Sequence, residues 1–296
     1  MPMSEKALTD FKTETENDFE LNELKKIIEF GWPDEKARVP PELQNFIVQS
    51  TVQSCLSRLI KLLTTQRPIC IIGISINIPY KEKLIPAEIS HSSAKKIPGQ
   101  KKYWIVLTHG AGGDMHTSQL VALTKYLMNL NCFVLRFTCK GLNMKYRMNV
   151  FNSVLEYLNE TYEPKGILIG GRSMGARSAV MLCSDPEGTM NTNLCDKIMG
   201  IICLSYPLHK PGDKKELREE PFRTLRTPVF FLSGTKDEMC DKVSLDKILK
   251  KYNVDFDIHW LVGCDHSAKP AKSYEDDMYT EAFQHVSDWC KKVLNL

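Results

Sequence analysis

Short apolar runs alternate with amphipathic segments along most of this chain. GILIGG (166–171) and PVFFLSG (228–234) are apolar at nearly every position, which is typical of parallel strands covered by helices on both faces. Between such runs apolar residues recur at helical spacing, as in MNVFNSVLEYLNETY (148–162) and VSLDKILKKYN (243–253). This alternation predicts an α/β domain over residues 67–296, with a mostly parallel, twisted sheet between helices.

The first 66 residues follow another pattern. LNELKKIIEFGW (21–32) and ELQNFIVQSTVQSCLSRLIKLL (42–63) repeat apolar residues at i, i+3 and i+4, and they predict two amphipathic helices separated by a proline-containing break. ICIIGISINIPY (69–80) and KLIPAEIS (83–90) then predict an antiparallel strand pair at the edge of the sheet. We expect a helical extension over residues 1–66, which either packs on the main domain or forms an arm that binds a protein partner.

Composition narrows the classes of partner. The chain has 296 residues, 43% of them hydrophobic, and a net charge of +3. That hydrophobic content supplies a sizeable core, while the nearly balanced charge lacks the basic excess typical of nucleic-acid binding. The chain does not begin with a basic and apolar leader, and no apolar run reaches the length of a membrane span. We therefore expect a cytoplasmic or nuclear protein that is not secreted and binds neither nucleic acid nor membrane.

Ten cysteines are scattered along the chain without a C-x-x-C pair. Several fall inside apolar runs, among them Cys70, Cys132 and Cys203. Buried, reduced thiols of an intracellular protein fit this pattern better than disulfides or structural zinc do. The sequence therefore predicts neither a disulfide framework nor a bound metal.

The strongest local motif is Gly171-Arg172-Ser173-Met174-Gly175, which follows GILIG and opens the helix-like MGARSAVML. In that context G-x-S-x-G predicts a tight strand-to-helix turn whose serine hydroxyl stands clear of the sheet. The small Gly171 and Gly175 allow the turn, and the Met174 N–H would face a developing oxyanion. The simpler interpretation is a serine that caps a helix. A nucleotide-binding loop fits worse, because Arg172 occupies the middle glycine position of a dinucleotide-binding motif and no G-K-[S/T] follows.

A second glycine-rich segment, His109-Gly110-Ala111-Gly112-Gly113, directly follows WIVLT. A strand that ends in HG and small residues resembles the oxyanion loop of α/β-hydrolases. We predict that the Ala111 N–H is the second oxyanion donor, that the glycines let the backbone turn inward, and that His109 supports the loop through hydrogen bonds. The alternative is an ordinary glycine-rich turn between a strand and a helix.

An acid follows in the order Ser…Asp…His that is typical of such enzymes. Asp237 lies in the loop after PVFFLSG, where it would share the carboxyl edge of the sheet with Ser173. It would hold the Nδ1–H of a catalytic histidine. Glu238 and Asp241 are competing acids, and a helix-capping role is the alternative for Asp237 itself.

His266, in WLVGCDHSAKP, is the predicted base, because it follows another strand and precedes the final helix. Its Nε2 would take the Ser173 proton and later return it to the leaving group. Asp265 beside it fits a loop brace better than a triad acid. The other histidines lie inside predicted elements or in polar surroundings, except that His209 follows a strand and could line a pocket.

Several segments together resemble one family of proteins. These are LTHGAGGDM, CFVLRFTCKGLN, GGRSMGARSA, CLSYPLH, FLSGTKDEMC and IHWLVGCDHS. In this order they resemble the testis-expressed-thirty group of α/β-hydrolase-like proteins, which is related to the hydrolase-like domain of a subunit of the nonspecific-lethal histone acetyltransferase complex. The resemblance covers residues 101–296. It implies a dienelactone-hydrolase-like α/β-hydrolase fold, with Ser173, Asp237 and His266 at the triad positions and an oxyanion loop at 109–113, and it supplies no substrate.

Two hypotheses of different classes follow. The first is a serine hydrolase that acts on a small ester, thioester or similar acyl substrate through an acyl-enzyme, without a metal or organic cofactor. The second is a non-catalytic or weakly active interaction module, as in a chromatin-associated complex. An intact set of motif residues favours the first, and a transferase or peptidase on the same fold stays open.

Overall fold

The computed structural model describes residues 72–91, 102–185, 188–268 and 275–296. The predicted helical extension over residues 1–66 and the boundary at residue 67 lie outside these residues, so both stay predictions. No helix in the described ranges is both long enough and apolar enough to cross a membrane.

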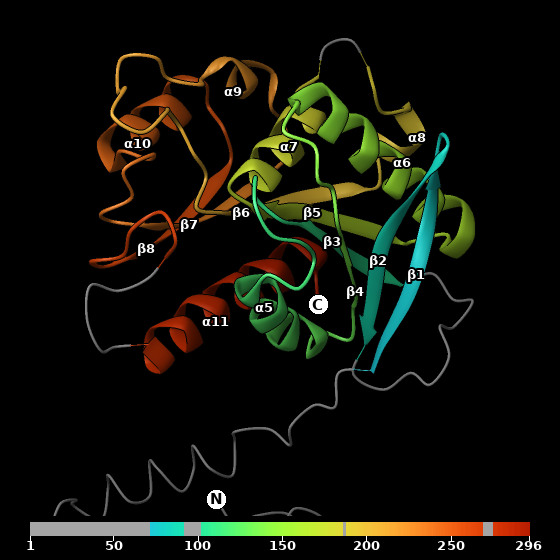
Figure 1. The fold of residues 1–296 in the computed structure, drawn as a ribbon. Helices are drawn as coiled ribbons and strands as arrows, with labels where there is room; N and C mark the ends of the chain where they lie inside the picture. Colours follow the sequence, from blue (N-terminus) through green and yellow to red (C-terminus); the bar gives the residue numbers. More distant parts are fainter. Residues whose placement is uncertain (1–71, 92–101, 186–187, 269–274) are drawn as a thin grey trace, which may run out of the picture. The chain divides into compact units, whose positions relative to one another are not determined.

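The described residues build one eight-stranded mixed sheet in the order β1-β2-β4-β3-β5-β6-β7-β8 (Figure 1). The strands are β1 (Ile72–Tyr80), β2 (Lys83–His91), β3 (Tyr103–Thr108), β4 (Phe133–Phe137), β5 (Gly166–Arg172), β6 (Ile198–Leu204), β7 (Val229–Gly234) and β8 (Phe256–Leu261). The β2 strand runs antiparallel to both β1 and β4, and all other neighbours are parallel. The predicted α/β-hydrolase fold with an antiparallel strand pair at its N-terminal edge is confirmed.

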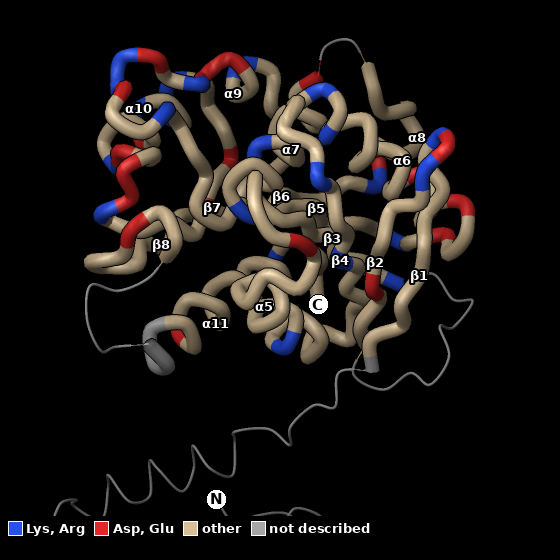
Figure 2. The backbone as a smooth tube through the Cα atoms, in the orientation of Figure 1, with Lys and Arg blue, Asp and Glu red and all other residues tan. Residues whose placement is uncertain are grey.

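Helices cover both faces of the sheet, as the doubly apolar strands predict. On one face lie α5 (Ser118–Met128) and α11 (Glu275–Leu294), which contact each other (Figure 1). The other face is covered by α6 (Met144–Tyr162), α7 (Met174–Cys183), α8 (Thr192–Cys195), α9 (Glu220–Thr224) and α10 (Lys242–Lys251). Acidic and basic residues are interspersed over α9 and α10 rather than separated by sign (Figure 2).

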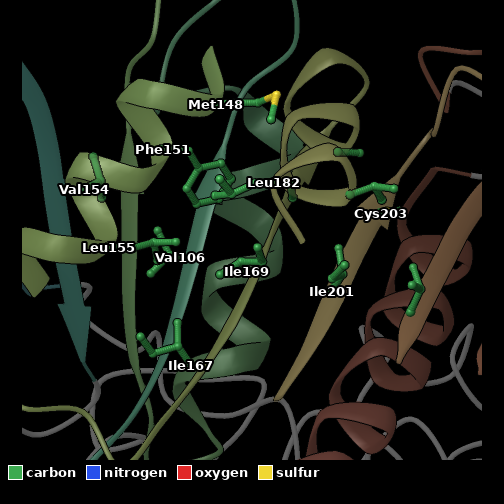
Figure 3. Close-up of a cluster of buried hydrophobic side chains, with 14 of the residues drawn as sticks. Val106, Met148, Phe151, Val154, Leu155, Ile167, Ile169, Leu182, Ile201 and Cys203 are labelled. Carbon is green, nitrogen blue, oxygen red and sulfur yellow. The ribbon is translucent and has the colours of Figure 1, made fainter. Parts of the chain in front are cut away.

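Two apolar clusters, one on each face, hold these layers together. In the larger cluster, Val106, Ile169 and Ile201 of the central strands face α6 and α7, where Phe151 and Leu182 are labelled (Figure 3). All of these side chains are at most 2% exposed, so each full burial contributes about 1.5–3 kcal/mol to folding. The packed centre fixes the strand ends that carry the candidate site. Every cysteine within the described ranges is a free thiol, and most are buried.

One helix begins earlier than the apolar pattern predicts. The periodicity marks a helix over 148–162, but α6 starts at Met144, one turn before that range. Asn143 caps it, because its side chain accepts a hydrogen bond from the Tyr146 N–H at 2.9 Å. The added turn brings Arg147 into the helix, and Arg147 contacts the candidate site.

Candidate active site

Ser173 sits in a strained turn between β5 and α7. Its φ of 51° and ψ of −112° lie in a region that costs a non-glycine residue about 1–3 kcal/mol. The flanking glycines are required by close packing rather than by their own φ. A Cβ on Gly171 would lie 2.2 Å from the Thr108 carbonyl oxygen, and one on Gly175 would lie 2.4 Å from the same atom. The elbow therefore fits against the end of β3 only with glycine at both positions.

Three predicted side chains, distant in sequence, meet at the carboxyl ends of the parallel strands. The Ser173 hydroxyl lies 2.9 Å from His266 Nε2. The other ring nitrogen, Nδ1, lies 2.9 and 3.0 Å from the two carboxylate oxygens of Asp237. These distances place an Nδ1–H donor toward Asp237 and leave Nε2 to accept the serine proton. The arrangement suits proton transfer from Ser173 as it attacks a carbonyl.

The competing acids have other partners. Asp237 has a buried carboxylate, which also accepts a hydrogen bond from the Met239 N–H at 2.8 Å. Glu238 accepts from the His266 backbone N–H at 3.3 Å instead of reaching the ring. Asp241 caps α10, where its bonds to Ser244 lower the pKa of its carboxyl group. Among these three acids, Asp237 alone contacts the imidazole.

The predicted oxyanion loop lies against the serine. A Cβ built on Gly110 would be 3.4 Å from Ser173 Cβ, and Gly113 adopts a φ of 81° that favours glycine. Ala111, Gly112 and Gly113 are exposed, so the backbone of this loop is open to a substrate. The Met174 N–H belongs to the first turn of α7, where amides have no intrahelical acceptor.

His109 supports the loop from inside the protein. Its Nε2 accepts a hydrogen bond from the Cys139 N–H at 2.9 Å, and its Nδ1 lies 3.3 Å from the Gly112 carbonyl oxygen. Burial, and secondarily the charge of Arg147, lowers the pKa of the His109 ring. A neutral imidazole with its proton on Nδ1 satisfies both contacts. His209, the other histidine considered for the pocket, is buried with its Nδ1 2.9 Å from the Lys210 carbonyl oxygen.

Arg147 is a residue at the site that the sequence patterns do not reveal. Its side chain is buried, and its guanidinium donates to four backbone carbonyl groups. The acceptors are His109 (2.9 Å), Gly110 (2.7 Å), Cys139 (2.8 Å) and Gly141 (2.5 Å). A trans peptide directs its C=O and N–H to opposite sides, so the bond to the Gly110 carbonyl turns the Ala111 N–H away from Arg147. No local pattern reveals this, because the acceptors come from two separate loops.

One group of side chains elsewhere could offer ligands to a metal. His259 of β8 lies with Glu281 and His285 of α11, and their ligand atoms are all within 4.8 Å of one another. The two imidazoles stack with ring centroids 4.3 Å apart, so their in-plane lone pairs do not converge on one point. None of these residues belongs to the predicted triad or the predicted oxyanion loop.

Comparison with known proteins identifies the family to which this architecture belongs. Residues 101–295 match a family described as "Alpha/beta hydrolase domain". Est1E from Butyrivibrio proteoclasticus superposes with a TM-score of 0.59 at 14% identity over 75% of this chain and 99% of its own. A dienelactone hydrolase from Anabaena variabilis gives 0.58 at 10% identity over 75% and 98%. An esterase from Pyrococcus furiosus gives 0.58 at 12% identity over 77% and 94%. At such identities these likenesses establish the fold.

Proposed function

This chain belongs to the alpha/beta hydrolase domain family, and from that premise we propose that it is a serine hydrolase that cleaves an ester, thioester or similar acyl bond. The observation that carries the proposal is the hydrogen-bonded chain from Ser173 through His266 to Asp237. Esterases and a dienelactone hydrolase among the structural neighbours agree with it.

In the first half-reaction, His266 Nε2 takes the proton of the Ser173 hydroxyl as the oxygen attacks the substrate carbonyl. The carbonyl oxygen gains negative charge, and the N–H groups of Ala111 and Met174 stabilise it. Asp237 stabilises the imidazolium that forms. His266 then gives its proton to the leaving group, which departs and leaves an acyl group on Ser173.

In the second half-reaction, water attacks the acyl group on Ser173. His266 accepts a proton from that water and returns one to the serine oxygen, which releases the acid and regenerates the hydroxyl. Each step uses only atoms of the chain, the substrate and water. The proposed substrate is a small acyl compound.

We further propose that the chain is a member of the testis-expressed-thirty group within this family. The support is the ordered set of sequence segments from LTHGAGGDM to IHWLVGCDHS. The proposal makes no statement about substrate, because the group as such supplies none.

Hydrolysis of p-nitrophenyl acetate tests the proposed function. We expect a burst of one equivalent of p-nitrophenol or steady turnover, with loss of at least about a thousandfold in Ser173→Ala and in His266→Ala. Ser153→Ala on α6 and His285→Ala on α11 are matched controls outside the site, and both should retain activity. A folded protein that releases no more p-nitrophenol than Ser173→Ala does would overturn the proposal and favour the interaction module.

A further inference from the structure

A cavity of about 520 Å³ opens beside the elbow, between α5, α11 and the loop that carries His266. Its apolar wall is formed by Ala122, Tyr126, Tyr279 and Phe283. Among the described residues, the rest of the lining consists of hydroxyl and amide side chains and one charged side chain, Arg172. A Cβ built on Gly110 would lie 3.2 Å from Arg172 Nη1 and 3.4 Å from Ser173 Cβ, so the guanidinium lies close to the side chain of the nucleophile.

Most hydrogen-bonding capacity of Arg172 is available to a ligand. Within the described residues, the guanidinium makes one hydrogen bond, from Nη2 to the His266 carbonyl oxygen at 3.0 Å. A guanidinium carries five N–H donors in a planar fork. Arg172 is half-buried, and partial burial strengthens the interaction of a cation with an anion because fewer water molecules screen it. The fork matches the geometry of a carboxylate.

Among the described residues, the nearby acids do not neutralise this cation by direct contact. Asp237, Glu238 and Asp265 are close enough to favour the charged form of Arg172, although burial has the larger effect and lowers its pKa. None of the three lines the cavity, and Asp237 is bound to the His266 ring. A carboxylate that enters the cavity can therefore bind the Arg172 guanidinium without displacing Asp237, Glu238 or Asp265.

We propose that this cavity binds an acyl substrate bearing a carboxylate, with Arg172 holding the carboxylate and the apolar wall holding the body of the molecule. The inference rests on the proposed hydrolase function and names its substrate class. An ester of a compact aromatic or short aliphatic compound with a free carboxylate has the required chemistry. A neutral ester of equal size keeps the apolar contacts and loses the charge-assisted bonds.

A pair of esters tests this substrate class. 4-Acetoxybenzoate is anionic, and its methyl ester is the matched neutral compound. We expect Arg172→Gln to lower the kcat/KM ratio of the anionic to the neutral ester by roughly 10- to 100-fold, as for loss of hydrogen bonds to a charged group. Arg172→Lys should give an intermediate ratio, because lysine keeps the charge without the fork. A ratio that stays constant while both rates fall would mean that Arg172 only braces the His266 loop, and would overturn the proposal.

The ratio is the useful quantity because any shift of His266 affects both esters alike. The control removes one positive charge at a position outside the cavity. Lys125 is exposed on α5 and does not line the cavity, so Lys125→Gln should leave the ratio within about twofold, which isolates contact from long-range electrostatics.

A binding measurement keeps this test separate from catalysis. Titration of benzoate and of neutral benzamide into the Ser173→Ala variant measures recognition without turnover. We expect benzoate to bind at least about tenfold more tightly than benzamide, and Arg172→Gln in the same background to remove the difference. Equal binding of the two compounds overturns the inference even if the enzyme hydrolyses esters. Selective benzoate binding by a protein without esterase activity would overturn the proposed function and keep the anion site.

Discussion

The two loops that meet at Ser173 are held in different ways. The predicted oxyanion loop, 109–113, is fixed from within the core, because buried Arg147 and His109 bond its backbone. The histidine loop, 262–268, is bonded to buried Asp237 through the His266 ring, and its backbone is held by exposed or part-buried side chains. Thr235 accepts a bond from Gly263, Gln119 donates to Ser267, and Arg172 donates to His266.

This difference separates two tasks in the proposed mechanism. Donors for a transition-state oxyanion need fixed positions before the substrate arrives. The buried Arg147 guanidinium acts as a clamp that fixes the loop backbone through its bonds to the His109 and Gly110 carbonyl groups. Gln119 and Arg172, which hold the histidine loop, also line the cavity. A substrate in that cavity therefore acts on the same groups that position the base. We expect core substitutions to change the rate of chemistry, and cavity substitutions to change substrate choice.

The largest expected effect comes from removing the buried carboxylate that contacts the His266 ring. Asp237→Asn keeps the shape but removes the carboxylate that selects the Nδ1–H form of His266. We expect kcat to fall by roughly 10⁴, the order seen when a triad acid is replaced by its amide. Steady-state kinetics with p-nitrophenyl acetate measures it. Glu238→Gln is the control, since Glu238 contacts only the His266 backbone, and a similar loss there would transfer the acid role away from Asp237.

Removing the Arg147 clamp from the predicted oxyanion loop should have the next largest effect. Arg147→Met strips four carbonyl groups of their donor, so we expect kcat to fall by roughly 10²–10³, the cost of one oxyanion donor, with little change in KM. Affinity for a boronic-acid transition-state analogue should fall in parallel with kcat, which a merely structural role does not require.

The same variant should also be less stable. Each buried acceptor without a donor costs about 1–3 kcal/mol, and urea unfolding measures the total. Arg147→Lys should recover part of both losses. A variant that is destabilised but keeps full kcat would show that the clamp serves folding alone.

The smallest predicted effect concerns pH. Because burial lowers the pKa of His109 below its usual 6.5, the unfolded chain binds a proton that the folded chain excludes. The contribution of this ring to stability is complete above about pH 6.5 and declines as the pH falls below that value, by at most about 1.4 kcal/mol per pH unit.

Urea unfolding at pH 7.5 and pH 5.0 measures this dependence. In His109→Gln the difference between the two pH values should shrink. His91 and His259 also have lowered pKa values, so part of the slope should remain. An unchanged slope would show that His109 carries no share of it.

Sequence patterns predict the sheet and the positions of the triad because both follow from local rules. Apolar runs define the strands, and loops after parallel strands meet at one edge, which places Ser173, Asp237 and His266 together. The glycines of the elbow are equally visible, although their reason, the close approach of the Thr108 carbonyl, is a tertiary contact.

Arg147 and Arg172 could not be assigned in this way. Arg147 lies before the apolar repeat that predicts α6, and its acceptors belong to loops that only the fold brings together. Arg172 occupies a variable position of G-x-S-x-G, and its cavity is built by α5 and α11, which are distant in sequence. Charged residues buried against backbone carbonyls leave no periodic signal.

The most direct test of the central claim is to locate a covalent adduct. The protein is treated with a fluorophosphonate, digested, and mapped by mass spectrometry. The account predicts one adduct, on Ser173, that is formed much more slowly in His266→Ala. A folded protein that gains no adduct, or one modified at another serine, would contradict it.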